Sequence, residues 1–276
     1  MNQQYVRVLT IAGSDSGGGA GIQADLKTFA ALGCYGMSAI TALTAQNTLG
    51  VTAIHGVPVE FLVAQIDAVM SDIGAHAVKI GMLHAPEVVQ AVAAAIDRHA
   101  MRQVVLDPVM VSATGARLIE PEAVQALVAE LFPRACLITP NLDEAALLLG
   151  RSVRAVSDML PAAEGLLQRG ARAVLLKGGH LPGETVHDLL LERGQAPLAL
   201  QAPRVATHNL HGAGCTLSSA IAAHLAQGAG LASAVRAARD FVHAALTAGA
   251  PVRTGHGVGP LAHGFAPLAL RTLALG

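Results

Sequence analysis

The chain contains no tryptophan and few other aromatic residues, with two Tyr and five Phe among 276 residues. Charged residues are also scarce, at 13%, and the formal net charge is −1. Lys and Arg are scattered singly, so the sequence lacks the basic run that lines a nucleic-acid surface, and we expect no nucleic-acid partner. Hydrophobic residues make up 53% of the chain. With so few aromatics, a large core must be built from aliphatic side chains.

Cysteine is scarce as well. Cys34, Cys136 and Cys215 are far apart and odd in number, so they predict neither a disulfide framework nor a C-x-x-C metal pair, and they favour a reducing cytoplasm. No apolar run reaches the roughly 18 residues that a membrane helix needs. The first residues also show no apolar signal core behind a basic start. We therefore expect a cytoplasmic protein with no membrane partner.

Glycine is plentiful, and its most informative turn is residues 211–215, called here the anion turn. Gly212 and Gly214 allow the backbone to turn tightly, and residues 216–227 show the apolar spacing of a helix. A helix that follows such a turn points free N–H groups and its positive dipole end at one spot, which favours a phosphate. Cys215 lies at the lip of the turn. A glycine turn before an ordinary packed helix remains the alternative.

Apolar strand-like runs alternate with helical patterns along most of the chain. The pattern predicts strands at residues 6–12, 37–45, 51–59, 77–80, 104–106, 137–139 and 173–176, and helices at 22–32, 60–73, 86–99, 121–131, 161–169, 216–227 and 232–248, with another from about 141. This alternation is typical of a mainly parallel sheet with helices on both faces, so we predict one α/β domain over residues 1–276. Residues 186–192 and 197–201 predict a hairpin-like insertion.

Polar residues follow several of these strands or open the next helix: Asp15, Gln46, Asp107, Asn141, Glu144, Lys177 and Cys215. Ligands bind at the carboxyl ends of parallel strands. Phosphoryl transfer needs carboxylates for Mg²⁺, a cation for phosphate oxygens and an anion hole, and this set supplies all three. Simpler explanations exist: Asp107 fits a turn, Lys177 fits a solvated surface position, and Asn141 with Glu144 fits a helix cap.

Seven segments, spread over nearly the whole chain, resemble the hydroxymethylpyrimidine/phosphomethylpyrimidine kinases of thiamine biosynthesis. They are residues 12–28, 41–48, 79–83, 107–110, 139–145, 177–180 and 211–218, and residues 255–263 add a weaker match to that family's C-terminal glycine turn. The resemblance implies a ribokinase-like fold with a small β flap. It also implies that ATP phosphorylates 4-amino-5-hydroxymethyl-2-methylpyrimidine and then its monophosphate, giving the diphosphate.

The resemblance also assigns roles by position. Gln46 would bind the pyrimidine in a pocket lined by Gly13, Ala20, Thr44, Met82, Val109 and Cys215. Asn141 and Glu144 carry the family's N-x-x-E element, which supports Mg²⁺ together with Asp107, and Lys177 with Asn141 would serve ATP. The backbone of Gly212, Ala213, Gly214 and Cys215 would form the anion hole.

Cys215 is also a possible base toward the substrate hydroxyl. A helix N-terminus can lower the pKa of a thiol, and a thiolate could take the hydroxyl proton during phosphoryl transfer. The alternative is a small thiol that only packs. Because phosphoryl transfer has a loose transition state, we expect the backbone N–H groups to contribute more than the thiol.

The sequence departs from the family at three positions: Leu210 and Ala213 each stand where Thr is usual, and Thr44 takes a usually aliphatic pocket position. Neither Leu210 nor Ala213 removes a backbone donor or a proposed metal ligand. The nearest rival function is a pyridoxal/pyridoxine kinase of the same fold, and a rival of another class is a non-catalytic pyrimidine-binding protein. We further expect a homodimer.

Overall fold

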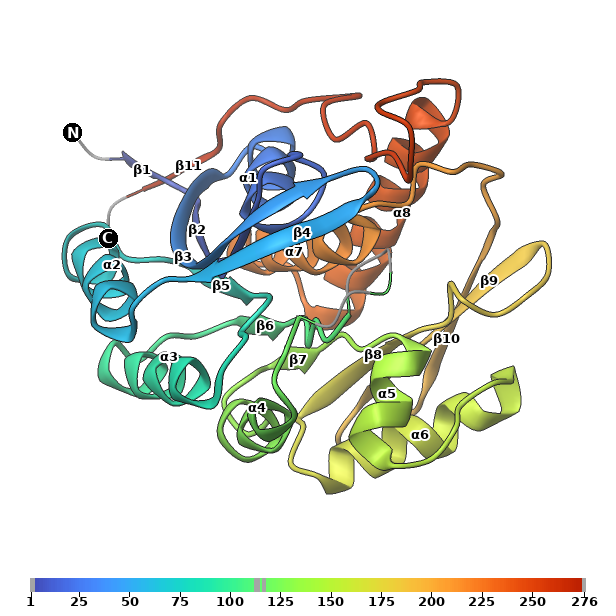
Figure 1. Cartoon of the computed structure of the whole chain (residues 1–276), viewed down its shortest axis with the longest axis horizontal. Coiled ribbons are helices and arrows are strands. Elements are labelled where there is room, and N and C mark those ends of the chain that lie inside the picture. The colour runs from blue at the N-terminus through green and yellow to red at the C-terminus, as the bar shows by residue number, and fades with distance from the viewer. Residues whose placement is uncertain (1–2, 112–114, 116–117, 275–276) are drawn as a thin grey trace.

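The computed structural model describes residues 3–111, 115 and 118–274. Within these residues, nine strands form a central sheet in the order β10-β9-β8-β7-β6-β5-β2-β3-β4 (Figure 1). They are β2 (Arg7–Asp15), β3 (Tyr35–Asn47), β4 (Gly50–Gly56), β5 (Ala77–Ile80), β6 (Val104–Leu106), β7 (Leu137–Ile138), β8 (Ala173–Lys177), β9 (Thr185–Glu192) and β10 (Leu198–Pro203). The strands from β3 to β8 in this order are parallel, and antiparallel strands form both edges.

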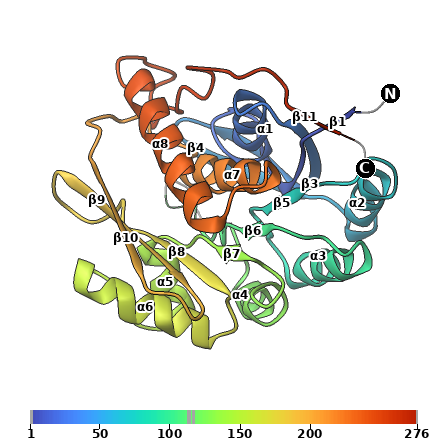
Figure 2. The same ribbon diagram turned by 180° about the vertical axis from the view of Figure 1, so that it is seen from behind.

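Helices cover both faces of the sheet (Figures 1 and 2). They are α1 (Gly21–Ala31), α2 (Val59–Asp72), α3 (Pro86–Arg98), α4 (Pro121–Ala126), the π-helix η1 (Leu127–Leu131), α5 (Leu142–Leu149), α6 (Val156–Gln168), α7 (Ala213–Ala226) and α8 (Leu231–Gly249). Two cores result: one under α2 to α6, the other under α1, α7 and α8. In β5, Val78 and Ile80 join the first core and Ala77 joins the second, as the alternation of a strand requires. The expected layered α/β fold is confirmed.

Several element bounds differ from those predicted, and each difference has a local cause. β5 and β6 have the predicted bounds, but α6 begins at Val156, ahead of the predicted start at Pro161. The start signal is Asp158, whose Oδ2 accepts the N–H groups of Arg154 at 2.9 Å and Ala155 at 3.0 Å. The predicted helix at 121–131 exists, but it changes to a π-helix at η1.

The predicted hairpin-like insertion is instead an edge of the central sheet. Both strands form, but β9 pairs with β8, placing Leu190 opposite Leu175, and β10 pairs with β9. The small flap lies at the other edge. There, β3 runs beyond Thr44, its last residue paired with β2, and its outer half pairs with β4. Sequence spacing shows that two strands are adjacent, but not which third strand they join.

The first and last described residues form a feature that the sequence patterns do not predict. β1 (Gln3–Tyr5) and β11 (Thr272–Ala274) pair antiparallel in a separate two-stranded sheet, with Gln3 opposite Ala274. The contact joins segments from opposite ends of the sequence (Figure 1).

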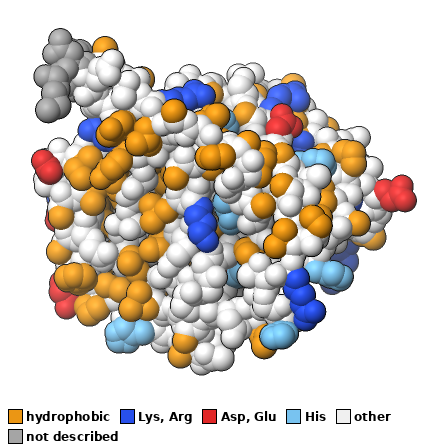
Figure 3. Space-filling view, turned by 90° about the horizontal axis from the view of Figure 1, so that it is seen from above, with side chains coloured by type: hydrophobic (Ala, Val, Ile, Leu, Met, Phe, Trp, Pro, Cys, Tyr) orange, Lys and Arg blue, Asp and Glu red, His pale blue; other side chains and the backbone are white. Residues whose placement is uncertain are grey.

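The surface reflects the low content of charge. Figure 3 shows hydrophobic side chains spread over the face seen from above, with charged side chains few and separate. Within the described residues, no helix combines the length and the apolar character required to cross a bilayer.

Candidate active site

The predicted polar residues gather where the parallel strands end. β2 ends at Asp15, β8 ends at Lys177, and Asp107 directly follows β6. The anion turn leads into α7 at the same edge, since a Cβ added at Gly214 would lie 3.2 Å from Lys177 Nζ and 3.7 Å from Asp107 Oδ2. The site has a charged part around Asp107 and an apolar cluster around Met82.

Lys177 and Asp107 form the centre of the charged part. Lys177 Nζ donates to Asp107 Oδ1 at 2.8 Å, and the Thr139 hydroxyl donates to the same oxygen at 2.9 Å. Their side chains are 13% and 2% exposed, so Lys177 is not a solvated surface residue. Burial alone would raise the pKa of Asp107, but the ammonium groups of Lys177 and Lys79 and these hydrogen bonds hold that pKa below its usual value. Asp107 is therefore ionised at neutral pH.

Asn141 and Glu144 form a helix cap, the simpler of the two explanations for this pair. Asn141 Oδ1 accepts the N–H of Glu144 and Glu144 Oε2 accepts the N–H of Asn141, both at 2.8 Å, which is a capping box at the start of α5. The Glu144 carboxyl also interacts electrostatically with Asp107 and Lys177 of the charged part. Burial, with a further contribution from Asp107, raises its pKa to about 7, while Lys177 opposes the shift.

The charge balance of this part suits a bound cation. Lys177 is the ammonium group that acts on both carboxyl groups, Asp107 and Glu144, and a further positive charge would favour the ionised form of Glu144. Mg²⁺ commonly takes one or two protein carboxylates and completes its shell with water and phosphate oxygens. The residues present therefore fit Mg²⁺. Within the described residues, no group of three or more His, Cys, Asp or Glu side chains is placed to hold a metal.

The anion turn enters its helix earlier than predicted. Gly212 is the N-cap with a φ of 83°, and α7 begins at Ala213. N–H groups at a helix start lack partners within the helix, and the dipole adds positive charge there. One of them is engaged, because the N–H of Ala213 donates to Leu210 O at 3.1 Å. The anion hole predicted for residues 212–215 therefore depends on its other donors.

The direction predicted for the Cys215 pKa is wrong. Burial is the main cause that raises the pKa of the thiol to about 11, and the carboxylates of Asp25 and Asp107 act in the same direction. Lys79 and the N–H of Gly21 lower it by less. Sequence reasoning considered only the helix terminus, whereas the folded chain also places buried carboxylates near the sulfur. At neutral pH the free protein therefore carries a thiol here, not a thiolate.

Met82 is the centre of the apolar part of the site. It belongs to a small apolar cluster separate from the two cores, and Val109 packs against that cluster. A Cβ added at Gly13 would lie 3.1 Å from Met82 Sδ. Ala20 lies toward the anion turn, since a Cβ added at Gly212 would come 3.2 Å from Ala20 Cα. Gly13 of β2 thus lies beside Met82, which follows β5, and Ala20 lies beside the anion turn.

Thr44 and Gln46 give this region its polar side. The Thr44 hydroxyl lies 2.9 Å from Ser14 O and 3.1 Å from Gln46 Oε1. Gln46 Nε2 lies 3.4 Å from Nε2 of His211, the first residue of the anion turn. The residue predicted to read the pyrimidine is therefore next to the turn predicted to bind phosphate.

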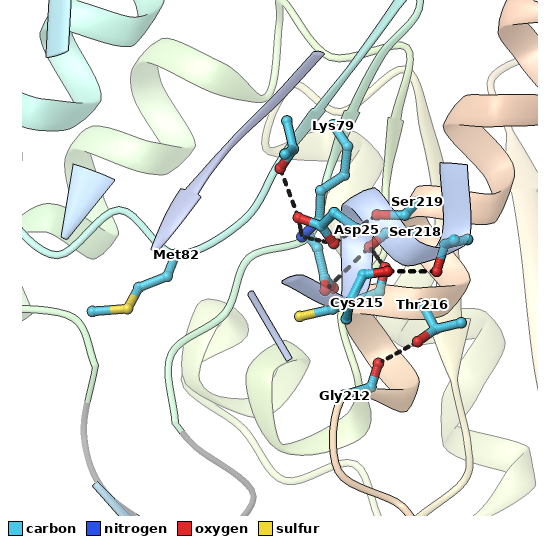
Figure 4. Close-up of polar contacts among 12 residues, drawn as sticks. Asp25, Lys79, Met82, Gly212, Cys215, Thr216, Ser218 and Ser219 are labelled. Atoms are coloured by element: carbon cyan, nitrogen blue, oxygen red, sulfur yellow. Dashed lines mark hydrogen bonds and ion pairs between the residues drawn. The ribbon is translucent and has the colours of Figure 1, made fainter. Parts of the chain in front are cut away.

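A buried ion pair that sequence reasoning did not assign to the site lies beside α7 (Figure 4). Lys79 Nζ is 2.9 Å from both oxygens of Asp25, and both side chains are 0% exposed. The hydroxyls of Thr10 and Ser219 donate to Asp25 at 2.6 and 2.7 Å. Ser219 follows Cys215 by one helical turn, so the pair anchors the face of α7 that carries the cysteine. The sequence does contain a signal for this ion pair. Asp25 and Lys79 are charged residues on otherwise apolar faces, Asp25 in a helix and Lys79 in a strand.

An apolar cavity of about 830 Å³ includes in its lining Met110, whose backbone hydrogen-bonds to the Glu144 carboxyl. It opens between η1 and α5, with Val128, Leu148 and Arg169 in its lining, and it includes no predicted site residue. The groups that phosphoryl transfer needs lie at the strand ends, where charges and glycine turns meet, and not in the lining of this cavity.

Comparison with known proteins gives one family. The family model described as phosphomethylpyrimidine kinase matches residues 15–262. A hydroxymethylpyrimidine/phosphomethylpyrimidine kinase of Rhizobium meliloti is 53% identical over 256 residues, which cover 92% of this chain and 96% of that protein.

Two solved structures are similar in fold as well as in sequence. An ADP complex of Bacillus subtilis pyridoxal kinase has a TM-score of 0.87 and 38% identity, over 94% of this chain and 98% of its own. A phosphomethylpyrimidine kinase from Clostridium difficile has a TM-score of 0.76 and 44% identity, over 87% of this chain and 99% of its own. The ribokinase-like fold implied by the sequence resemblance is confirmed.

Proposed function

Because the chain belongs to the phosphomethylpyrimidine kinase family, we propose that it uses ATP to phosphorylate 4-amino-5-hydroxymethyl-2-methylpyrimidine and then the resulting monophosphate. Both reactions belong to thiamine biosynthesis. The observation that carries the proposal is the contact between Asp107 and Lys177 next to Gly214 of the anion turn. It joins the carboxylate, cation and backbone donors that phosphoryl transfer needs.

The charged part supplies the phosphate side of the reaction. Asp107 and Glu144 would hold Mg²⁺, and this ion would supply positive charge to the phosphates. Asn141 contributes by fixing Glu144 through the capping box. Lys177 binds phosphate oxygens of ATP, and the N–H groups of the anion turn stabilise charge on the transferred group.

The pocket supplies the pyrimidine side. Gln46 offers both a donor and an acceptor, which match the ring nitrogen and exocyclic amine of an aminopyrimidine. In this proposal the walls of the pyrimidine pocket are Gly13, Ala20, Thr44, Met82, Val109 and Cys215, and contacts of Gly13 and Val109 with Met82 support it. Figure 4 shows the Cys215 sulfur directed toward the side on which Met82 lies, so the thiol is placed to contact a substrate there.

Pyridoxal phosphorylation is a second candidate, favoured by one observation. The backbone is more similar to that of the B. subtilis pyridoxal kinase than to that of the C. difficile phosphomethylpyrimidine kinase. A non-catalytic pyrimidine-binding protein is not favoured, because binding alone has no use for a buried carboxylate and ammonium beside an anion turn.

An ADP-release assay distinguishes these functions. The purified protein is given ATP and Mg²⁺ with the pyrimidine, its monophosphate or pyridoxal, and kcat/KM is measured for each. We expect turnover of both pyrimidines with values well above that for pyridoxal. The opposite order would establish the second candidate, and tight pyrimidine binding without ADP release would establish a binding protein.

A cytoplasmic homodimer completes the proposal. The β3–β4 flap exposes apolar side chains, with Leu43 at 47%, Leu49 at 64% and Ile54 at 43%, and such surface supports contact with a second copy. Light scattering of the purified protein would measure twice the 28.0 kDa mass of one chain. Cell fractionation would test the compartment.

A further inference from the structure

Two glycine turns pack backbone against backbone at the site. The first, residues 16–20, connects β2 to α1, and the second is the anion turn. A Cβ added at Gly212 would overlap the carbonyl oxygen of Gly19, and a Cβ added at Gly19 would overlap the ring of His211. Gly212 also has a φ of 83°, which favours glycine. The position of one turn therefore fixes the position of the other.

Asp15 and His211 join these two turns. Asp15 Oδ2 accepts the N–H groups of Gly19 at 3.0 Å and Ala20 at 2.8 Å, and it lies 2.8 Å from His211 Nε2. Asp15 Oδ1 accepts the N–H of Gly17 at 2.8 Å. Asp15 and His211 are only 3% and 7% exposed. The pair is thus a buried link between the first glycine turn and the anion turn.

The contact with Asp15 determines which nitrogen of His211 carries a proton. Burial would raise the pKa of Asp15, but the hydrogen bonds from His211, Ala20 and Gly17 lower it overall, so Asp15 is ionised. An ionised carboxylate only accepts hydrogen bonds. His211 Nε2 must therefore carry a hydrogen and donate it to Asp15. The backbone N–H of His211 donates to Gly259 O at 3.0 Å, which anchors the residue from its other side.

This proton placement constrains Gln46. Its amide nitrogen lies 3.4 Å from His211 Nε2, but both nitrogens are then donors, so they form no hydrogen bond. On its other side, the Gln46 carbonyl faces the Thr44 hydroxyl at 3.1 Å. The Gln46 amide hydrogens therefore have no acceptor at His211 and remain available for another acceptor. In the proposed pocket that acceptor is the substrate.

We propose that His211 is a positioning residue that couples recognition of the pyrimidine at Gln46 to the placement of the anion turn, with Asp15 holding the imidazole. The inference rests on the proposed function. It predicts that one side chain affects both substrate affinity and turnover, because His211 contacts the substrate reader through its ring and precedes Gly212 in the turn.

The test compares His211→Leu with two matched variants. His211→Gln retains an N–H donor for Asp15, and His208→Leu changes an exposed histidine three residues earlier. We expect His211→Leu to raise the pyrimidine KM and lower kcat, each by roughly tenfold, as loss of a buried hydrogen bond would. The KM for ATP should stay within about twofold. His211→Gln should recover much of both losses, and His208→Leu should match the parent.

A double variant that combines His211→Leu with Gln46→Leu tests whether His211 affects the pyrimidine KM through Gln46. If His211 acts on affinity through Gln46, adding His211→Leu to Gln46→Leu will raise the pyrimidine KM little further. Multiplicative effects on KM would overturn the coupling. If His211→Leu does not fold, the same comparison with His211→Gln decides, because a role in coupling still predicts a measurable loss.

Different results would overturn the proposed function and the role of His211. Absence of pyrimidine turnover by the parent protein would overturn the proposed function and, with it, this inference. Normal parent turnover combined with parent-like kcat and KM in folded His211→Leu would overturn this inference alone.

Discussion

Lys79 and Asp25 form an ion pair with no exposed side-chain surface, and Ser219 ties this pair to the helix that begins at the anion turn. The ammonium gains stability from Asp25, which raises the pKa of Lys79 despite the opposing effect of burial. The carboxylate is satisfied by Lys79, Thr10 and Ser219 together. The position of α7 at the site thus depends on an ion pair whose side chains are not exposed to water.

Removal of one partner of this pair should strongly destabilise the fold. Lys79→Met leaves a buried carboxylate without a counter-charge, which costs about 3–5 kcal/mol in comparable cases. The free energy of unfolding, measured by urea denaturation, should fall by that order. The double variant Asp25→Asn, Lys79→Met should regain part of the loss. The exposed pair of Asp67 and Arg98 is the control, and Asp67→Asn should change stability little. A small effect of Lys79→Met would contradict the prediction.

Asp107→Asn should reduce turnover by impairing Mg²⁺ binding. The carboxamide keeps the size of the side chain but removes the charge that faces Lys177 and a metal ion. We expect a lower kcat and a higher Mg²⁺ concentration for half-maximal activity, with only partial rescue by excess Mg²⁺. Asp97→Asn, at an exposed position on α3, serves as the control. Parent values of kcat and of Mg²⁺ dependence in Asp107→Asn would show that the metal role is wrong.

Cys215→Ala should lower kcat by less than the roughly 10²-fold that loss of a general base costs. The reason is that burial raises the thiol pKa to about 11, so little thiolate exists at neutral pH. Steady-state kinetics and thermal unfolding of Cys215→Ala and Cys215→Ser provide the measurement. A fall of 10²-fold or more in a stable variant, together with loss of a rise in kcat at alkaline pH, would restore the base role.

Glu144→Gln should change how stability depends on pH. In the folded protein the Glu144 pKa is raised from 4.5 to about 7, so the folded state holds a proton that the unfolded state has lost between these values. Stability from this group is complete below pH 4.5 and declines as pH rises to about 7, by on the order of 3 kcal/mol. Glutamine at this position can still complete the capping box.

The measurement is the difference in unfolding free energy between parent and Glu144→Gln at several pH values, without Mg²⁺. Other titrating groups cancel in this difference. Parallel stability curves across pH 4.5 to 7 would mean that Glu144 has an ordinary pKa in the folded protein.

The elements that sequence analysis predicted well are those with local signals. Asp107-Pro108 after β6 and Gly81 after β5 mark where those strands end. At α6 the local signals compete: Pro161 suggests a helix start, but Asp158 supplies the cap. The pairing of β9 with β8 and of β1 with β11 depends on contacts distant in the sequence, which spacing does not encode.

In the candidate site, too, the features with local sequence signals could be predicted and those that depend on distant contacts could not. Asp107, Lys177 and the anion turn could be predicted because each follows a strand or precedes a helix. Their mutual contacts, and the raised pKa of Cys215, could not, because burial and neighbouring charge are properties of the folded chain. The role of His211 was missed because its partner Asp15 lies 196 residues away in the sequence.

The pairing of β1 with β11 determines how the molecule would bear a mechanical load. Gln3 faces Ala274 and Tyr5 faces Thr272, so a tension that separates residues 3 and 274 acts at the open end of this short ladder. The hydrogen bonds would break one after another, as in a zipper, rather than together in shear. The ladder would therefore open at low force, and it would do so before tension reached β2, the central sheet and the site at its edge.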